Sequence, residues 1–240
     1  MDGNGKEYHN NDKIHFEGEY LFGERWNGKI IEYHSNGKIA FEGVYLNGEI
    51  NGEAKEYHSN GKLYFEGEYL NGKRNGKGKE YNNYGKLYFK GDYLFGERWN
   101  GKIITYHSNG KLKFEGEYLN GKINGNGKKY NTNGLLIFEG EYLNGEINGK
   151  GKVYDSSGNI LFEGEYLFGK KWNGTIIKYH YNDKISFEAE YINGEINGKV
   201  EKYHPNGEII FEGKYLFGEI WNGKIIEYYY NDKISFEGNT

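Results

Sequence analysis

The sequence predicts an all-β fold in which tandem β-hairpin repeats stack into an elongated, twisted, rod-like single antiparallel sheet. Three observations support this prediction: a repeated phenylalanine motif, strict alternation of apolar and polar side chains, and Asn-Gly pairs between the alternating segments. Alternation is typical of a strand with one buried and one exposed face. Asn-Gly is the strongest short signal of a hairpin turn. Residues 1–240 are therefore expected to form one continuous array of about ten units.

One phenylalanine marks each repeat, and its copies are spaced by 25 or 24 residues, as in 41 − 16 = 25 and 65 − 41 = 24. Such a period is typical of arrays whose units stack on their neighbours. The copies are Phe16, Phe41, Phe65, Phe89, Phe114, Phe138, Phe162, Phe187, Phe211 and Phe236.

The first strand of a typical repeat is expected near residues 63–70, where alternate side chains point to opposite faces. Its glycine, Gly67, should leave a trough for an aromatic ring of the neighbouring hairpin, because glycine has no side chain. The repeat-face aromatic residues expected to pack in this way are Phe16, Tyr20, Phe41, Tyr45, Phe65, Tyr69, Phe89, Tyr93, Phe114, Tyr118, Phe138, Tyr142, Phe162, Tyr166, Phe187, Tyr191, Phe211 and Tyr215.

The second strand, near residues 77–81, follows two Asn-Gly pairs at residues 71–72 and 75–76. Asn and Gly tolerate positive φ, so both pairs predict tight connections. A short turn such as Ser-Asn-Gly-Lys at residues 35–38 closes the unit. Glutamates of first strands and lysines of second strands should form mild cross-strand pairs on the other face, each worth about 0.2–1 kcal/mol.

These repeats resemble the MORN family. The motif reads Phe-Glu-Gly-Glu-Tyr-Leu-Asn-Gly-Lys-x-Asn-Gly-Lys-Gly, with Asn-Gly-Lys before the next Phe, and it is most similar to the slightly longer variant units. The resemblance covers essentially the whole chain. It implies stacked hairpins in an elongated, grooved sheet and roles as scaffolds between proteins. It also implies phospholipid association for some members, and no catalytic residue that could be carried over.

Four repeats carry one extra residue, a tryptophan, a Phe in place of the usual Asn after Leu, and two consecutive Ile residues in the second strand. Each cluster is expected either to pack internally, with Trp over a wider loop, or to anchor a partner or a second copy, because Trp is enriched in binding hot spots. A remnant of tandem duplication is the third interpretation. The candidate partner-binding residues are Trp26, Trp99, Trp172, Trp221, Phe22, Phe95, Phe168 and Phe217.

Composition narrows the possible partners and location. Lys and Arg total 31 against 35 Asp and Glu, a net charge of −4, which gives no general attraction to nucleic acid or anionic lipid. The chain has no Cys and therefore no disulfides. A cytoplasmic location is expected, because no segment reads as a signal peptide or a membrane span.

Residue patterns that look catalytic have structural explanations. Paired carboxylates such as Glu17 and Glu19, about 7 Å apart, recur in nearly every repeat, as solvated ladder charges would. Residues 67–73 have the spacing of a phosphate-binding loop, but Arg74 stands where Ser or Thr is needed. Six of the 7 His follow Tyr near a turn, and are expected to be solvated and too far apart to share a metal. We expect no enzyme, no cofactor and no metal site.

The expected function is therefore a non-enzymatic scaffold that presents an extended surface for protein–protein interaction. Peripheral phospholipid association is the alternative, and carbohydrate binding by aromatic hairpins is a further one. The array begins and ends with half-units, residues 1–12 and 225–240. These suggest either a piece of a longer array or pairing with other molecules, so self-association through the open ends or the Trp edge is also expected.

Overall fold

The fold is described from a computed structural model, for residues 2–10, 12–229 and 233–240. These residues form 21 β-strands and no helix. They make two compact units: the first runs to residue 105 and includes residues 117–122, and the second contains residues 106–116 and those from 123 onward. The predicted single array of residues 1–240 includes residues 1, 11 and 230–232, which lie outside the described part, and stays a prediction for the whole chain.

The strands of the first unit follow one another in short hairpins. They are β1 (Gly3–Tyr8), β2 (Ile14–Leu21), β3 (Glu24–Tyr33), β4 (Ile39–Leu46), β5 (Glu49–Ile50), β6 (Gly52–Tyr57), β7 (Leu63–Leu70), β8 (Lys73–Tyr81), β9 (Leu87–Leu94) and β10 (Glu97–Tyr106), whose last residue belongs to the second unit. Consecutive strands pair antiparallel, and β4 pairs with both β5 and β6.

The second unit repeats this pattern. β11 (Leu112–Leu119) and β12 (Lys122–Tyr130) have residues in both units. The later strands are β13 (Leu136–Leu143), β14 (Glu146–Tyr154), β15 (Ile160–Leu167), β16 (Lys170–Tyr179), β17 (Ile185–Ile192), β18 (Glu195–Tyr203), β19 (Ile209–Leu216), β20 (Glu219–Tyr228) and β21 (Ile234–Asn239). From β12 to β21 each strand pairs antiparallel with the next.

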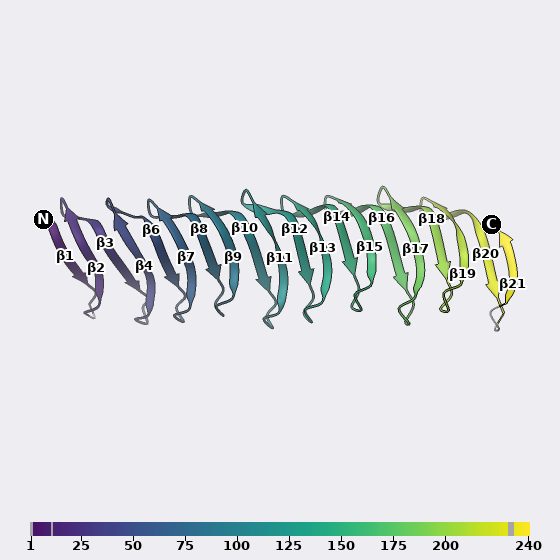
Figure 1. The fold of residues 1–240 in the computed structure, drawn as a ribbon, viewed down its shortest axis with the longest axis horizontal. Helices are drawn as coiled ribbons and strands as arrows, with labels where there is room; N and C mark the ends of the chain where they lie inside the picture. The colour runs from purple at the N-terminus through teal and green to yellow at the C-terminus, as the bar shows by residue number, and fades with distance from the viewer. Residues whose placement is uncertain (1, 11, 230–232) are drawn as a thin grey trace. The chain divides into compact units, whose positions relative to one another are not determined.

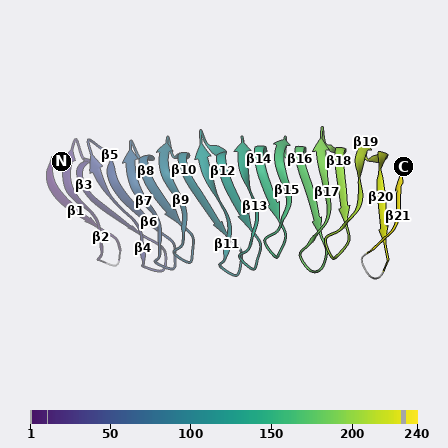
Figure 2. The same ribbon diagram turned by 45° about the vertical axis from the view of Figure 1, so that its right-hand side comes forward.

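Within each unit the hairpins lie side by side in chain order (Figures 1 and 2). Among the described residues, β1 pairs only with β2 and β21 only with β20, so these edges are open. The predicted all-β class, with tandem hairpins in an open antiparallel sheet, is confirmed. The rod-like form of the complete chain stays a prediction.

Each first strand presents its Phe and Tyr to one face of the sheet, which we call the aromatic face. Phe65 is fully buried there. Its ring makes edge-to-face contacts with Tyr69 of its own strand, at 6.0 Å between centroids, and with Tyr93 of the next first strand, at 5.1 Å. Such pairs add about 0.5–1.5 kcal/mol beyond the area they bury. The opposite, polar face carries the cross-strand glutamates and lysines.

The glycine between Phe and Tyr has a different neighbour from the one predicted. A Cβ on Gly67 would lie 2.8 Å from the ring of Phe65 in its own strand and 2.6 Å from the Cα of Gly78 in the paired strand. The ring of the next hairpin covers the second-strand glycine instead: a Cβ on Gly78 would lie 2.9 Å from Tyr93. The paired glycines therefore let two backbones approach closely beneath one Phe ring.

Two kinds of turn alternate along the chain. The tip turn joins the two strands of a hairpin, and its central residues have positive φ, as in Asn71 (50°) and Gly72 (73°). This confirms the Asn-Gly turn prediction at the tips. The base turn leads to the next hairpin: at residues 58–62 the His58 carbonyl accepts from the Gly61 N–H at 2.7 Å, and the His58 N–H donates to the Lys62 carbonyl at 2.8 Å.

The second Asn-Gly pair forms a bulge within the second strand, and the prediction of a tight connection there was wrong. In β8, residues 75–77 oppose only Glu68 of β7. Gly76 has a φ of 95°, which a bulge requires as much as a turn does. The Asn75 Oδ1 accepts the backbone N–H of Phe95 in the next tip turn, at 3.3 Å. The bulge therefore links one hairpin to the next.

The extra residue of the Trp-containing repeats lies in the second strand, so the predicted wider loop was wrong. In short repeats one second-strand glycine, such as Gly78, pairs with glycines on both sides. In β3, Gly28 pairs with Gly18 of β2, whereas Ile30 pairs with Gly43 of β4. The register therefore moves by two residues (30 − 28) across the strand, and β16 and β20 show the same step.

Candidate interaction surfaces

The predicted repeat-face aromatic residues lie on the aromatic face of their units. Their edge-to-face pairs have ring centroids between 5.1 and 6.2 Å apart. The phenylalanines are buried apart from the half-buried Phe187, and the tyrosines range from the buried Tyr93 to the half-buried Tyr118. These side chains fill the core, so little of their ring surface faces a partner.

Three arginines cover the aromatic face of the first unit, and each reaches a glutamate two strands earlier. Arg74 makes a bidentate pair with Glu56, with Nε–Oε1 at 2.7 Å and Nη2–Oε2 at 2.8 Å. Its guanidinium also lies 4.3 Å from the ring centroid of Phe65. Bidentate pairing and ring stacking both suit the planar guanidinium. Arg74 therefore joins two hairpins and covers the ring beneath.

Glu80 is the centre of the largest such network and is only 3% exposed. It accepts hydrogen bonds from Tyr93 Oη at 2.7 Å, from Arg74 Nη1 at 3.2 Å, and from the Nε (3.2 Å) and Nη2 of Arg98. A buried carboxylate is stable only when paired in this way. Burial and the Glu80 carboxylate both raise the pKa of the Tyr93 hydroxyl.

The same arrangement recurs between Arg25 and Glu7 in strands β3 and β1. Hydrogen bonding from the Arg25 guanidinium lowers the pKa of the Glu7 carboxyl to about 2, and the Tyr20 hydroxyl adds a 2.7 Å hydrogen bond. The carboxylate thus stays charged over the physiological pH range.

In the second unit, lysines are the cations of the aromatic face. Lys129 lies 5.6 Å from the ring centroid of Tyr142, Lys202 lies 5.3 Å from that of Phe211, and Lys171 lies 4.7 Å from that of Phe162. Cation–π attraction there replaces the ion pairs of the first unit. Burial lowers the pKa of the Lys171 ammonium. In both units, the cationic groups on the aromatic face therefore lie over aromatic rings of the same face.

These cations were not anticipated from the sequence, although a signal for them exists. Each Arg follows a Glu by 18 residues, as in 25 − 7, 74 − 56 and 98 − 80. Where Ile replaces Arg, as at Ile147 and Ile196, the earlier position holds Lys129 and Lys178. Three repeats depart from this pairing, with Glu32 and Ile50, Thr105 and Ile123, and Val153 and Lys171. Comparing repeats at this spacing would have predicted the ion pairs.

The four predicted Phe residues lie at the tip turns, and they are the most exposed large apolar side chains of those turns. Their exposed fractions are 86% for Phe22, 75% for Phe95 and 74% for Phe168 and Phe217. All have positive φ, between 48° and 52°. Short repeats place Asn at this position, as at Asn71. The rings therefore project from residues whose backbone conformation favours Asn or Gly.

The backbone of each such turn is held by the preceding hairpin. The Phe95 N–H donates to Asn75 Oδ1 and the Gly96 N–H donates to the Arg74 carbonyl at 2.9 Å. The corresponding short-repeat turn makes the same two bonds, from Asn71 to Asn51 Oδ1 and from Gly72 to the Ile50 carbonyl. The turn is thus built identically with either residue.

The structure separates the three parts of each predicted Trp cluster. Ile30 is 1% exposed on the aromatic face, whereas Phe22 extends into solvent. Trp26 is half-buried, with its ring beside Gly48 of the next tip turn. Among the described residues no ring contact joins a Trp to a Phe. A single internally packed cluster is therefore not formed, and its role in binding stays a prediction.

The remaining tryptophans are more exposed, and all lie beside tip turns. Trp99 and Trp172 are each 37% exposed and Trp221 is 66% exposed. The Trp99 carbonyl accepts the N–H of Gly121, and the Trp172 carbonyl that of Gly194, each at 3.0 Å. The tryptophan backbone thus supports the next turn while much of the ring remains accessible.

The turn histidines were predicted to be solvated, and the structure differs from that prediction. His34 and His58 are half-buried, and their Nε2 atoms lie 2.8 and 3.0 Å from the carbonyls of Tyr57 and Tyr81 in the next base turns. A carbonyl only accepts, so Nε2 carries the proton. Asn36 and Lys38 of the same turn also donate to the next turn, at 2.7 and 2.8 Å. The base-turn motif thus connects hairpins.

The part of the chain that the structure describes contains no group of three or more His, Cys, Asp or Glu residues that could hold a metal. Within the same residues, no helix is long and apolar enough to cross a membrane.

The repeats match the models of two known repeat families. Residues 1–21, 26–47, 50–71, 99–120 and 196–216 match the MORN repeat variant, and residues 65–86, 114–135 and 138–160 match the MORN repeat. Together these matches cover about two thirds of the chain. No curated protein is a significant match to the sequence.

Solved structures that align with the chain include a crystal structure of TcdB2-TccC3-Cdc42, with a TM-score of 0.27 and 10% identity over 99% of this chain and 15% of that chain. Another is the Photorhabdus luminescens Tc holotoxin pore, with a TM-score of 0.23 and 9% identity over 98% of this chain and 15% of that one. This chain thus spans about one seventh of the chains it matches. Such low TM-scores do not establish a shared fold.

Proposed function

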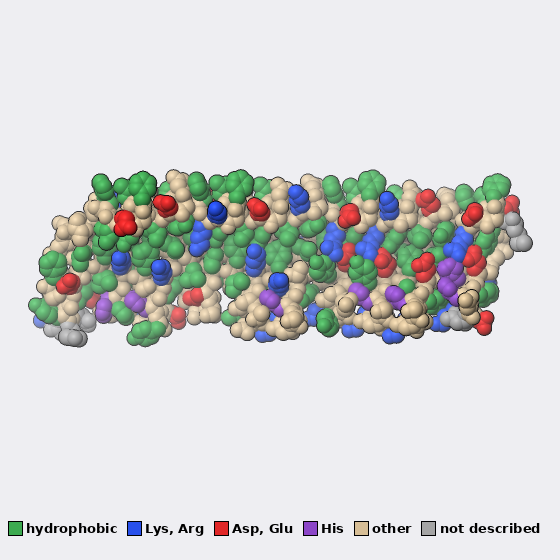
Figure 3. Space-filling model, turned by 180° about the vertical axis from the view of Figure 1, so that it is seen from behind, with side chains coloured by type: hydrophobic (Ala, Val, Ile, Leu, Met, Phe, Trp, Pro, Cys, Tyr) green, Lys and Arg blue, Asp and Glu red, His purple; other side chains and the backbone are tan. Residues whose placement is uncertain are grey.

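The chain belongs to the MORN repeat family, and from that premise we propose that it is a non-enzymatic scaffold that binds protein partners along its tip edge. We define the tip edge of each unit as its row of tip turns with the adjacent Trp residues. Hydrophobic side chains gather along this edge, at the top of the view in Figure 3. In the first unit the exposed ones are Phe22, Leu46, Leu70, Phe95, Trp99 and Leu119.

The observation that supports this function best is the exposed Phe at positive φ. A left-handed backbone costs an ordinary residue about 1–2 kcal/mol, and an exposed ring gains nothing from burial. Asn at the same place would avoid both costs, as it does in the short repeats. An exposed Phe with this conformational cost recurs in four tip turns. We infer that these rings anchor a partner, because aromatic side chains are common in binding hot spots.

The charges around the tips argue against the lipid alternative. The residue that follows the tip glycine is Glu in six repeats and Lys in three. Anionic membranes attract basic segments by about 1 kcal/mol per cation and repel carboxylates. The acidic residues are Glu24, Glu49, Glu97, Glu146, Glu195 and Glu219, and the basic ones are Lys73, Lys122 and Lys170.

The experiment changes all four tip Phe residues to Asn, which places the short-repeat residue in each turn. The variant should fold with equal or higher stability, because Asn tolerates positive φ. Partner capture from lysate of the source cells is then compared between the natural chain and the variant. The matched control carries Tyr84→Asn and Tyr181→Ser, which remove two aromatic side chains that are 76% and 94% exposed in base turns.

The proposal expects a saturable protein partner that binds the natural chain and the control but not the Phe→Asn variant. Equal capture by all three proteins would refute the tip edge as the binding surface. Sedimentation with neutral and anionic vesicles runs in parallel, and binding to vesicles that depends on the four Phe residues would favour the lipid alternative instead.

A further inference from the structure

The polar face of the first unit carries a ladder of opposite charges, and one first-strand position in it departs from the repeat. First-strand glutamates alternate with second-strand lysines: Glu17 lies 2.8 Å from Lys6, and Glu66 lies 2.9 Å from Lys79. Alternation of this kind stabilises neighbouring strands, whereas like charges directly opposite each other destabilise them. The ladder position directly after the repeat phenylalanine is Glu in all repeats but one. These glutamates are Glu17, Glu42, Glu66, Glu115, Glu139, Glu163, Glu188, Glu212 and Glu237.

Lys90 is the exception, and it places three lysines in a row. Lys79 of β8 pairs with Lys90 of β9, and Lys90 pairs with Lys102 of β10. Both Lys90 and Lys102 are exposed, and neither side chain forms a hydrogen bond or ion pair with another of the described residues. Lys79 alone has a carboxylate partner, Glu66. The first unit therefore holds two adjacent ammonium groups that no side chain neutralises.

These lysines line a hollow of about 740 Å³ in the first unit. Five lysines line it, Lys55, Lys77, Lys79, Lys90 and Lys102, together with three carboxylates, Glu53, Glu66 and Asp92. The lining charge is therefore 5 − 3 = +2, in a chain whose net charge is −4. The backbone of glycines such as Gly78 and Gly91 forms part of the wall, so a ligand can approach it closely. The volume lies within the usual range of small-molecule sites, about 300–1,000 Å³.

The second unit has a row of like charges of the opposite sign. There Glu188, Glu201 and Glu212 lie opposite one another across β17, β18 and β19. Lys199 forms an ion pair with Glu201 at 2.7 Å, whereas Lys224, directly across from Glu212, forms its ion pair with Glu237.

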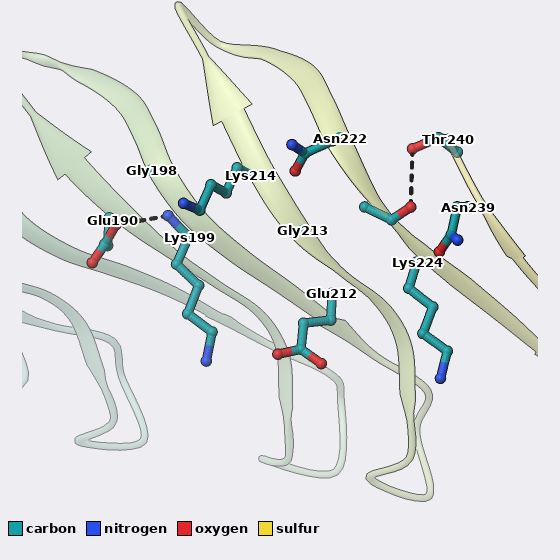
Figure 4. Close-up of a pocket in the computed structure, with 11 residues that line it drawn as sticks. Glu190, Gly198, Lys199, Glu212, Gly213, Lys214, Asn222, Lys224, Asn239 and Thr240 are labelled. Atoms are coloured by element: carbon teal, nitrogen blue, oxygen red, sulfur yellow. Dashed lines mark hydrogen bonds between the residues drawn. The ribbon is translucent and has the colours of Figure 1, made fainter.

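Figure 4 shows the hollow beside this acidic row, with Lys199, Lys214 and Lys224 interspersed with Glu190 and Glu212. The acidic row therefore has lysines beside it and across from it. In the first unit the residue across from Lys90 on either side is another lysine.

We propose that the lysine-lined hollow of the first unit binds a compact oligoanion carrying phosphate groups. One phosphate monoester carries about −1.5 to −2 charge at neutral pH. A single such group could therefore neutralise both Lys90 and Lys102 and relieve their repulsion. Lysine is a point-charge donor that suits phosphate. This site lies on the polar face and is independent of the tip edge proposed above.

The test measures the binding of inorganic tripolyphosphate and of inositol hexakisphosphate by titration calorimetry. A third arm uses neutral vesicles with and without a phosphoinositide, which separates a free phosphate compound from a lipid headgroup. The variant is Lys90→Glu, which restores the repeat residue and the alternation between Lys79 and Lys102. It should therefore fold at least as stably as the natural chain, and circular dichroism and thermal melting check this.

The matched control is Lys214→Glu in the second unit. It changes the net charge by the same amount and also restores the acidic residue common at its position, as in Glu165 and Glu190. Lys102→Gln provides a milder test of the same hollow. We expect Lys90→Glu to weaken binding by at least about tenfold, because it replaces a charge-assisted contact with repulsion. Lys214→Glu should leave the affinity within about twofold, since screening limits the effect of distant charges.

Loss of tripolyphosphate or inositol phosphate binding in Lys90→Glu, but not in Lys214→Glu, supports a site for free phosphate compounds. Binding to phosphoinositide vesicles alone, with the same pattern of loss, supports a headgroup as the source. No binding to any of these probes, or binding that falls equally in both Glu variants, overturns the proposal.

Discussion

Replacing the buried Glu80 with Gln tests whether the arginine network stabilises the first unit. The change keeps the side-chain shape but removes the charge that faces two guanidinium groups. Three of the four hydrogen bonds to Glu80 come from Arg74 and Arg98. A bond between charged groups contributes about 1.5–3 kcal/mol against about 1 kcal/mol for a neutral one. If each of the three bonds contributes about 1 kcal/mol less, the free energy of unfolding should fall by about 3 kcal/mol.

The assay is urea denaturation followed by Trp fluorescence and circular dichroism. Glu163→Gln is the control, because Glu163 pairs with Lys152 at 2.8 Å while the two side chains are 52% and 38% exposed. Exposed pairs contribute about 0–1 kcal/mol. Adding Arg98→Ile to the Glu80→Gln variant should recover part of the loss, because it removes the cation left without a partner. Equal costs for Glu80→Gln and Glu163→Gln would refute the role assigned to the buried network.

Three further predictions concern acid stability, close packing and shape. The pKa of Glu7 is lowered in the folded state to about 2 from an ordinary value of 4.5. Its pairing with Arg25 therefore stabilises the fold above about pH 4.5, and this contribution is lost as the pH falls through about 2. Thermal melts between pH 6 and pH 2 should show a smaller acid-induced loss of stability in Arg25→Gln than in the natural chain. Gly164→Ala should destabilise the second unit by about 1–3 kcal/mol, because its Cβ would lie 2.1 Å from the Asn173 carbonyl oxygen; denaturation unchanged from the natural chain would contradict this contact. Small-angle scattering should show an extended particle, and a compact one would refute the rod-like array.

Local signals in the sequence were sufficient to predict the hairpins. The alternation around Phe65 and the tip-turn pair at residues 71–72 specify a strand and a turn without reference to distant residues. The same dipeptide at residues 75–76 was misjudged because Asn-Gly suits a bulge as well as a turn. Only the pairing register, in which residues 75–77 oppose Glu68, distinguishes the two.

The candidate surfaces were less predictable, because they depend on which strands become neighbours. The change from Asn to Phe at Phe22 is visible in the sequence, but an apolar ring is normally expected to be packed rather than 86% exposed. Lys90 is visibly different from the other repeats, but only the register shows that Lys79 and Lys102 flank it. Likewise, Arg98 and Glu80 are 18 residues apart and meet only because one strand lies between theirs.

The base-turn side chains give the array a direction. His58 of one turn contacts the carbonyl of Tyr81, 23 residues later, and Asn36 donates to Ser59 at the same separation. A substitution in one turn should therefore loosen the following turn more than its own. In a mutational scan read out by proteolysis or amide exchange, the sensitive position would be displaced from the mutated one by about one repeat toward the C-terminus.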